Sequence, residues 1–191
     1  MGLEKKERAA MANPAEARGD EGIRILHRMS KDELVRIIID DAKNWLAHDG
    51  LWFQAVERRD GLEAAIQLDE AAWAKFSEIE AKRIMARHDI PFRSGLDGLR
   101  RALGYRLYAL LNTQKVAKVT PDSFEYFMVE CRVQYARRQK HMAPFPCKSV
   151  GIIEYSVFAK TIDDRITTEC IGCPPDPGAG ADYWCGWRFK I

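Results

Sequence analysis

The sequence has no long apolar run. Its longest hydrophobic stretches fall far short of the roughly 18–20 residues that a membrane-spanning helix needs, so we expect no membrane anchor. The opening stretch, MGLEKKERAAMANPAEARGDEG, also lacks the apolar core of a secretory signal. We therefore expect a flexible arm over residues 1–28 and a cytoplasmic protein. Cysteine thiols stay reduced in that compartment.

An excess of charge of one sign is missing as well. The chain carries 30 Lys and Arg against 28 Asp and Glu, a net charge of +2. This balance gives no basic surface for nucleic acid, and no DNA-binding helix pair is evident. With 191 residues, 47% of them hydrophobic, the chain can bury one real core. We expect a small-molecule ligand as its partner and leave a homo-oligomer open.

Helical spacing of apolar residues dominates the first half. Ser30 and Glu33 have the spacing of a capping box and open a predicted helix over residues 30–59. Further helices are predicted over residues 61–88 and from Ser94 to about residue 112. Gly50 is a candidate kink in the first of them.

The second half is richer in aromatic and β-branched residues. Strands are predicted over residues 123–135, 165–173 and 183–191, with a helix over 147–163 between the first two. The fold class is then α+β, with N-terminal helices packed on a small antiparallel sheet and β-α-β-β order in the C-terminal half. We expect a single domain over residues 29–191. Its helical part would cover residues 29–113 and its cysteine-bearing sheet part residues 120–191.

Cysteines are few, and their number is odd. Five cysteines fit a closed disulfide framework poorly, so free thiols are expected. Cys170 and Cys173 end one predicted strand and Cys185 opens the next, so a hairpin would bring these thiols together. Such a cluster can bind zinc, or an iron–sulfur cluster. The fourth ligand would be Cys131, Cys147, Glu154, a histidine or water. The second C-x-x-C of a zinc ribbon is absent, however, and buried apolar cysteines or a redox or nucleophilic pair remain alternatives.

Cys147 stands at a predicted helix N-terminus beside Lys148, and both features lower the pKa of a thiol. Gly151 and Glu154 follow on the same helix face, so the glycine could leave a small pocket between a nucleophilic thiol and a carboxylate. The alternative is that Gly151 simply lets the helix lie close to the sheet. Cys147 and Glu154 are therefore candidate catalytic residues.

The stretch WLAHDGLWF places Trp45, His48 and Trp52 on one helix face, with Asp41 one turn earlier. We expect Trp45, Trp52 and Asp41 to bind a ligand and His48 to move protons. The alternative is a core histidine that donates to a backbone carbonyl.

Two carboxylates of the next helix raise a separate alternative. Asp69 and Glu80 fall near its apolar face and could pair, but Arg83 one turn after Glu80 suggests an ordinary ion pair. The E-x-x-H spacing of di-iron bundles is absent.

Several stretches carry a resemblance over residues 30–191, namely NWLAHDGLWFQAVE, EAKRIM, FPCKSVGIIEYSVFAKTIDDRI, CIGCPPD and YWCGWRF. Together they resemble an uncharacterised bacterial family labelled as a domain of unknown function. More distantly, Cys131, Cys147 and the final C-x-W-R-F at Cys185 resemble the aminothiazoline-carboxylate hydrolases, which implies hydrolytic ring opening. The β-α-β-β order is similar to vinyl-reductase-type ligand-binding domains. That resemblance implies zinc held by Cys170 or Cys173, Cys185 and Glu154.

These observations lead to one expected function. The chain should be a metal-binding, small-molecule-binding protein, and if it is an enzyme it should hydrolyse a small C–N or C–S compound. The alternative is a non-catalytic ligand sensor or binding module in which zinc only stabilises the sheet.

Overall fold

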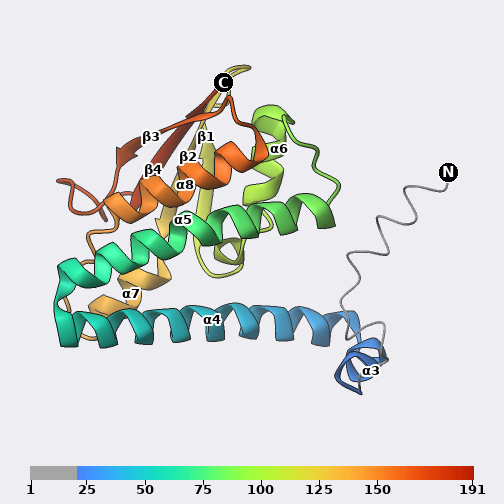
Figure 1. The fold of residues 1–191 in the computed structure, drawn as a ribbon, viewed down its shortest axis with the longest axis horizontal. Coiled ribbons are helices and arrows are strands. Elements are labelled where there is room, and N and C mark those ends of the chain that lie inside the picture. Colours follow the sequence, from blue (N-terminus) through green and yellow to red (C-terminus); the bar gives the residue numbers. More distant parts are fainter. Residues whose placement is uncertain (1–20) are drawn as a thin grey trace. The chain divides into compact units, whose positions relative to one another are not determined.

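The computed structural model describes residues 21–191 (Figure 1). The chain divides into two compact units, Met1–Asp41 and Ala42–Ile191. Helix α3 (Glu21–Arg28) and the start of α4 (Lys31–Asp60) are the described part of the first unit. Residues 21–28, which we expected in a flexible arm, thus form a helix, and the rest of that predicted arm lies outside the described residues.

The capping box that opens α4 is confirmed. The Ser30 backbone N–H donates to Glu33 Oε2 at 2.8 Å, and the Glu33 N–H donates back to Ser30 Oγ at 3.3 Å. Two backbone donors that the first helical turn leaves unpaired are satisfied in this way. Helix α4 then continues through Gly50 without a break.

The second unit holds the rest of α4 and all later elements. Along the chain these are α5 (Leu62–Arg87), α6 (Gly95–Leu103), the 3₁₀ helix η1 (Leu107–Leu110), β1 (Thr113–Ala117), β2 (Ser123–Glu130), α7 (Arg132–Gln139), α8 (Lys148–Ile162), β3 (Thr167–Gly172) and β4 (Cys185–Lys190). The α+β class, the N-terminal helices and the antiparallel sheet are confirmed.

The four strands form one antiparallel sheet in the order β1-β2-β4-β3. Helix α8 lies against one face of this sheet, and α5 packs on α8 (Figure 1). Tyr126, Trp187 and Cys170 are neighbours across three strands, so their side chains share a face. Tyr126 and Trp187 belong to the main core, together with Tyr155 and Phe158 of α8, and Cys170 is partly buried against it. Burial of these rings against the sheet supplies much of the hydrophobic stabilisation.

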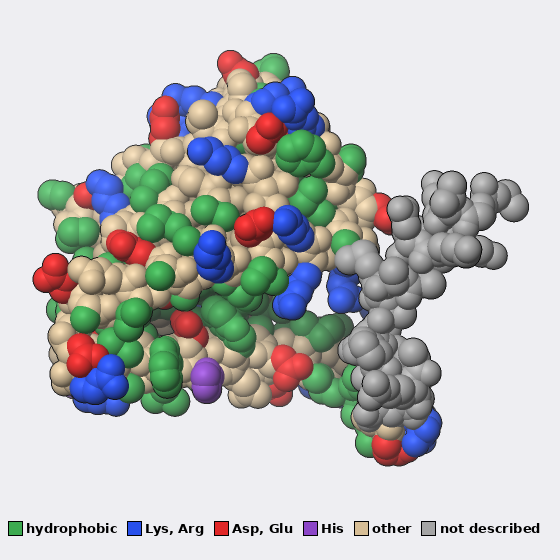
Figure 2. All heavy atoms as spheres, viewed as in Figure 1, with side chains coloured by type: hydrophobic (Ala, Val, Ile, Leu, Met, Phe, Trp, Pro, Cys, Tyr) green, Lys and Arg blue, Asp and Glu red, His purple; other side chains and the backbone are tan. Residues whose placement is uncertain are grey.

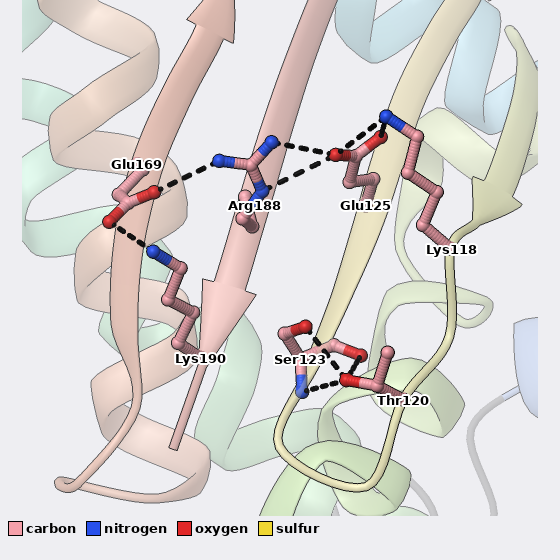
Figure 3. A network of polar contacts seen from close by, with 7 residues as sticks. All are labelled: Lys118, Thr120, Ser123, Glu125, Glu169, Arg188 and Lys190. Carbon is pink, nitrogen blue, oxygen red and sulfur yellow. Dashed lines mark hydrogen bonds and ion pairs between the residues drawn. The ribbon is translucent and has the colours of Figure 1, made fainter.

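The other face of the sheet carries a row of alternating charges (Figure 3). Arg188 on β4 donates to Glu125 on β2 at 2.8 Å and to Glu169 on β3 at 3.3 Å. Lys118 and Lys190 extend the row at its two ends. Opposite charges on directly paired strands stabilise their register modestly, so this face holds the strands in place.

Two predicted elements end earlier than expected, and helix α7 and strand β1 were missed. The third helix stops at Leu103 instead of about residue 112, the 3₁₀ helix η1 follows, and Arg106 between the two is buried. The strand predicted over residues 123–135 stops at Glu130 and gives way to α7. Strand β1 was not predicted.

Residues 42–60 of α4 meet α5 and the segment before α8 through a second, aromatic cluster. Trp45 stacks on Phe76 with ring centroids 5.4 Å apart, and Phe53 meets Phe145 edge to face at 4.9 Å. Figure 2 shows hydrophobic side chains gathered along the seam between these two helices. Among residues 21–191, no helix combines the length and apolar character needed to cross a membrane.

Candidate functional site

A cavity of about 260 Å³ opens within the second unit. This volume is slightly below the roughly 300–1,000 Å³ typical of small-molecule sites. Its walls come from α4, α5, η1, β2, α7, α8, β4 and the loop after β3. Apolar and aromatic side chains dominate the lining, but four cysteines and three carboxylates also border it: Cys131, Cys147, Cys173, Cys185, Asp49, Asp69 and Glu154.

Cys147 occupies the N-cap position of α8, as the sequence predicted. Its Sγ lies 3.5 Å from the Sγ of Cys173, and Gln134 Nε2 donates to it at 3.7 Å. Gln134 is itself fixed by two bonds to the backbone of Phe145, at 2.8 and 2.9 Å. The Cys147 sulfur thus lies beside two polar side chains at a helix N-terminus, where the helix dipole also favours negative charge.

The two thiols of this pair titrate in opposite directions. The hydrogen bond from Cys173 lowers the pKa of Cys147, although burial opposes the change. Hydrogen bonds to Cys147 and Cys185, with burial, raise the pKa of Cys173. Cys147 is therefore the thiol that ionises first, and Cys173 keeps its proton and donates it. Lys148, which the sequence suggested as the activating cation, instead binds Asp176 at 2.8 and 2.9 Å.

The three carboxylates influence one another. Burial raises the pKa of Asp69 to about 7, and the negative charges of Asp49 and Glu154 add to this effect. Burial also raises the pKa of Asp49 and of Glu154. A carboxyl group with a pKa near 7 can both give and take a proton at neutral pH, so Asp69 has the character of a general acid–base group.

Glu154 is held by a buried arginine behind the cavity. Arg106, only 1% exposed, forms ion pairs with Glu154 at 2.7 Å and with Glu80 at 2.9 Å. Four aromatic rings surround its guanidinium with centroids 4.7–5.8 Å from Cζ, those of Trp73, Tyr108, Tyr155 and Phe158. The ion pair that we expected between Glu80 and Arg83 is replaced by this buried one. Glu154 is thus fixed in place as part of a structural charge cluster.

Gly151 sits where α8 meets the indole of Trp187. A Cβ at this position would lie 2.7 Å from Trp187 Cζ2 and 2.9 Å from Cη2. Gly151 therefore lets α8 lie close to the sheet, as the alternative had it, and Cys147, Gly151 and Glu154 also all border the cavity.

The predicted metal ligands do not all reach one place. Cys131, Cys173 and Cys185 line the cavity, whereas Cys170 packs against the core from β3 and does not border it. Burial raises the pKa of Cys131 to about 12, so this thiol stays protonated. Within residues 21–191, no three His, Cys, Asp or Glu side chains have the spacing of a metal site. Zinc and an iron–sulfur cluster remain predictions from the cysteine spacing.

The expected ligand-binding wall on α4 lies outside the cavity. Trp45, His48 and Trp52 line a separate surface groove together with Asp49. Trp45 is half-buried in the aromatic cluster, whereas Trp52 is 69% exposed and His48 is exposed. Asp41 is exposed and belongs to the first unit. The roles given to these four residues stay predictions.

Sequence reasoning assigned no role at the site to Asp69, Arg106 or Gln134. Asp69 was noted only as a carboxylate near an apolar helix face, and a carboxylate in that position is the signal that could have found it. Arg106 and Gln134 carry no comparable signal, because their partners are distant in the sequence.

Comparison with protein families assigns the chain to one of them. No curated protein matches the chain significantly. A family of unknown function, DUF6125, has a model that matches residues 27–191. Since this match covers most of the sequence, the chain belongs to the DUF6125 family.

Proposed function

We propose that this protein binds a small organic molecule in the cavity and hydrolyses a C–N or C–S bond in it, with Cys147 as the nucleophile. The observation that carries the proposal is the position of the Cys147 thiol. It stands at a helix N-terminus, receives hydrogen bonds from Cys173 and Gln134, and faces a cavity with room for a ligand. Reactive cysteines occur in such surroundings, whereas inert buried cysteines lack them.

The proposed reaction uses two groups that line the cavity, the Cys147 thiolate and the Asp69 carboxyl group. The Cys147 thiolate adds to the electrophilic carbon of the substrate, and the C–N or C–S bond breaks as protonated Asp69 gives its proton to the leaving atom. The resulting Asp69 carboxylate then takes a proton from water, which attacks the thioester-like intermediate and releases the thiolate. Asp69 replaces Glu154 and His48 in this role, because Arg106 holds Glu154 and His48 lies outside the cavity.

The cavity also offers groups that could orient a substrate. The indole N–H of Trp187 is buried without a hydrogen-bond partner within residues 21–191, and Trp187 borders the cavity. A ligand acceptor could satisfy this donor, because a buried unpaired N–H costs free energy. Asp49 provides a second carboxylate beside Asp69 that favours a ligand with donor groups.

The first test concerns the thiol alone and needs no substrate. Iodoacetamide should alkylate Cys147 faster than Cys170 near pH 7, because Cys147 has a lowered pKa and Cys170 a raised one. Peptide mass spectrometry over a pH series measures both rates in the same chain. Faster alkylation of Cys170 would show that the local environment does not activate Cys147.

The second test concerns turnover. A panel of small thiazolines, thioesters and amides, starting with 2-aminothiazoline-4-carboxylate, is incubated in ¹⁸O-labelled water, and products are followed by mass spectrometry. Wild type should form labelled product, Cys147→Ser should lose turnover, and Asp69→Asn should lose most turnover because both formation and hydrolysis of the Cys147 adduct need this carboxyl group. Cys170→Ser is the matched control and should keep full activity. Undiminished turnover in Cys147→Ser would refute the mechanism, and saturable binding without turnover would favour a non-catalytic binding module.

A further inference from the structure

Cys147 and Cys173 come from separate parts of the chain but are held face to face. Two bonds fix the loop after β3 against the first residue of α8: the Lys148 N–H donates to the Pro174 carbonyl at 3.0 Å, and Lys148 Nζ binds Asp176. The Cys173 N–H also donates to Asp176 at 3.2 Å. The 3.5 Å separation of the two sulfurs is therefore set by several contacts besides their own.

We propose that Cys147 and Cys173 are a redox pair that forms a reversible disulfide when a peroxide enters the cavity. A disulfide has an S–S distance of about 2.05 Å, so the sulfurs need to approach by roughly 1.5 Å from their present separation. Side-chain rotation at either cysteine supplies movement of this order. The pair goes beyond the proposed hydrolysis and does not depend on it, since it rests on the juxtaposition of the thiols.

Exposure sets the order of the two steps. Cys147 is partly exposed and borders the cavity, whereas Cys173 is only 1% exposed. The Cys147 thiolate attacks one peroxide oxygen, the O–O bond breaks, and with one proton taken up the products are a sulfenic acid and water. The Cys173 thiol then attacks the sulfenic sulfur, and the hydroxyl leaves as water with the Cys173 proton. Overall, two thiols are oxidised and one hydrogen peroxide is reduced to two waters.

The consequence for the site is direct. A sulfur in a disulfide is no longer a thiolate, so oxidation would remove the nucleophile of the proposed hydrolysis. The burial of Cys173 beside it makes the disulfide, rather than further oxidation to the irreversible sulfinic acid, the expected product. The pair would thus protect Cys147 and switch it off at the same time.

The experiment treats the full chain with hydrogen peroxide, blocks remaining thiols with iodoacetamide, and maps cross-linked peptides by mass spectrometry. Wild type should lose two hydrogen atoms in mass, show a Cys147–Cys173 cross-link, and recover with dithiothreitol. Cys173→Ser should instead trap the Cys147 sulfenic acid, detected with dimedone. Cys170→Ser is the matched control, since it removes the C-x-x-C partner of Cys173 but leaves the proposed pair intact, and should form the cross-link as wild type does.

Several outcomes would overturn the proposal. A disulfide from Cys173 to Cys170 or Cys185, or a Cys147 sulfinic acid with Cys173 still free, would show that the two sulfurs do not react together. Zinc bound by Cys147 and Cys173 in the purified chain, protecting both from peroxide, would also refute it. If Cys173→Ser does not fold, the presence or absence of the Cys147–Cys173 cross-link in wild type still tests the proposal. A cross-link in a chain without hydrolytic activity would support the redox pair while the hydrolase proposal fails.

Discussion

The contact between Gly151 and Trp187 predicts how much Gly151→Ala lowers the free energy of unfolding. Replacing Gly151 by Ala would put a methyl group 2.7 and 2.9 Å from two ring carbons, whereas carbon atoms pack best at about 3.5–4.0 Å. The ring cannot easily move, because Trp187 is 1% exposed and stacks on Tyr155 with centroids 5.0 Å apart. Overpacking of this kind costs about 1–3 kcal/mol of unfolding free energy.

Alanine also has an intrinsic advantage over glycine in a helix, of about 1 kcal/mol. Gly50→Ala in α4 isolates this term, because no heavy atom lies within 4 Å of the added Cβ. The gain is common to both variants, so Gly151→Ala should be less stable than Gly50→Ala by about 1–3 kcal/mol, the cost of the clash alone. Urea unfolding followed by circular dichroism measures this difference, provided that the slopes with denaturant agree.

A second background makes the test specific to the tryptophan ring. Phenylalanine lacks the fused ring that carries Cζ2 and Cη2, so Trp187→Phe should relieve most of the cost of Gly151→Ala. The coupling energy of the double-mutant cycle should then be about 1 kcal/mol or more. If Gly151→Ala is as stable as Gly50→Ala, or if Trp187→Phe leaves the cost unchanged, the packing argument is wrong.

Three further predictions concern the buried charges. Arg106→Met leaves Glu80 and Glu154 unpaired and should cost about 3–5 kcal/mol in urea unfolding, whereas Arg100→Met on the surface of α6 should change little. Because the pKa of Asp69 is raised to about 7, the ionisation of this one group lowers the unfolding free energy as the pH rises from about 4 to 7. Asp69→Asn should remove this loss in unfolding curves across that range. Ionisation of Asp163 has the opposite effect on stability. Hydrogen bonds from Arg165 lower its pKa to about 2, so its contribution to the unfolding free energy is present above about pH 4 and lost toward pH 2. Asp163→Asn should thus be destabilised at pH 7 and approach wild type near pH 2.

The elements with strong local signals could be predicted from the sequence. The capping box of Ser30 and Glu33 marked the start of α4, and Cys147 marked the start of α8, because caps and helical periodicity depend on neighbours a few residues away. Strand β1 lacked such a signal, since its five residues pair with β2 and bury little. Helix α7 was taken for the end of a strand, and what fixes it lies elsewhere: Arg137 binds Glu57 through two hydrogen bonds at 2.9 and 3.0 Å.

The cysteines show why the site was harder to predict than the fold. The C-x-x-C spacing suggested Cys170 as the partner of Cys173, but Cys170 points with Trp187 toward the core while the chain bends after β3. Cys173 instead contacts Cys185 and Cys147. Cys147 lies 26 residues earlier in the chain, and the docking of α8 on the sheet brings it to Cys173. Each cysteine was a candidate for a local reason: Cys147 stands at a predicted helix N-terminus, and Cys173 belongs to the C-x-x-C motif. Their contact is tertiary, so spacing along the chain could nominate both residues but could not pair them.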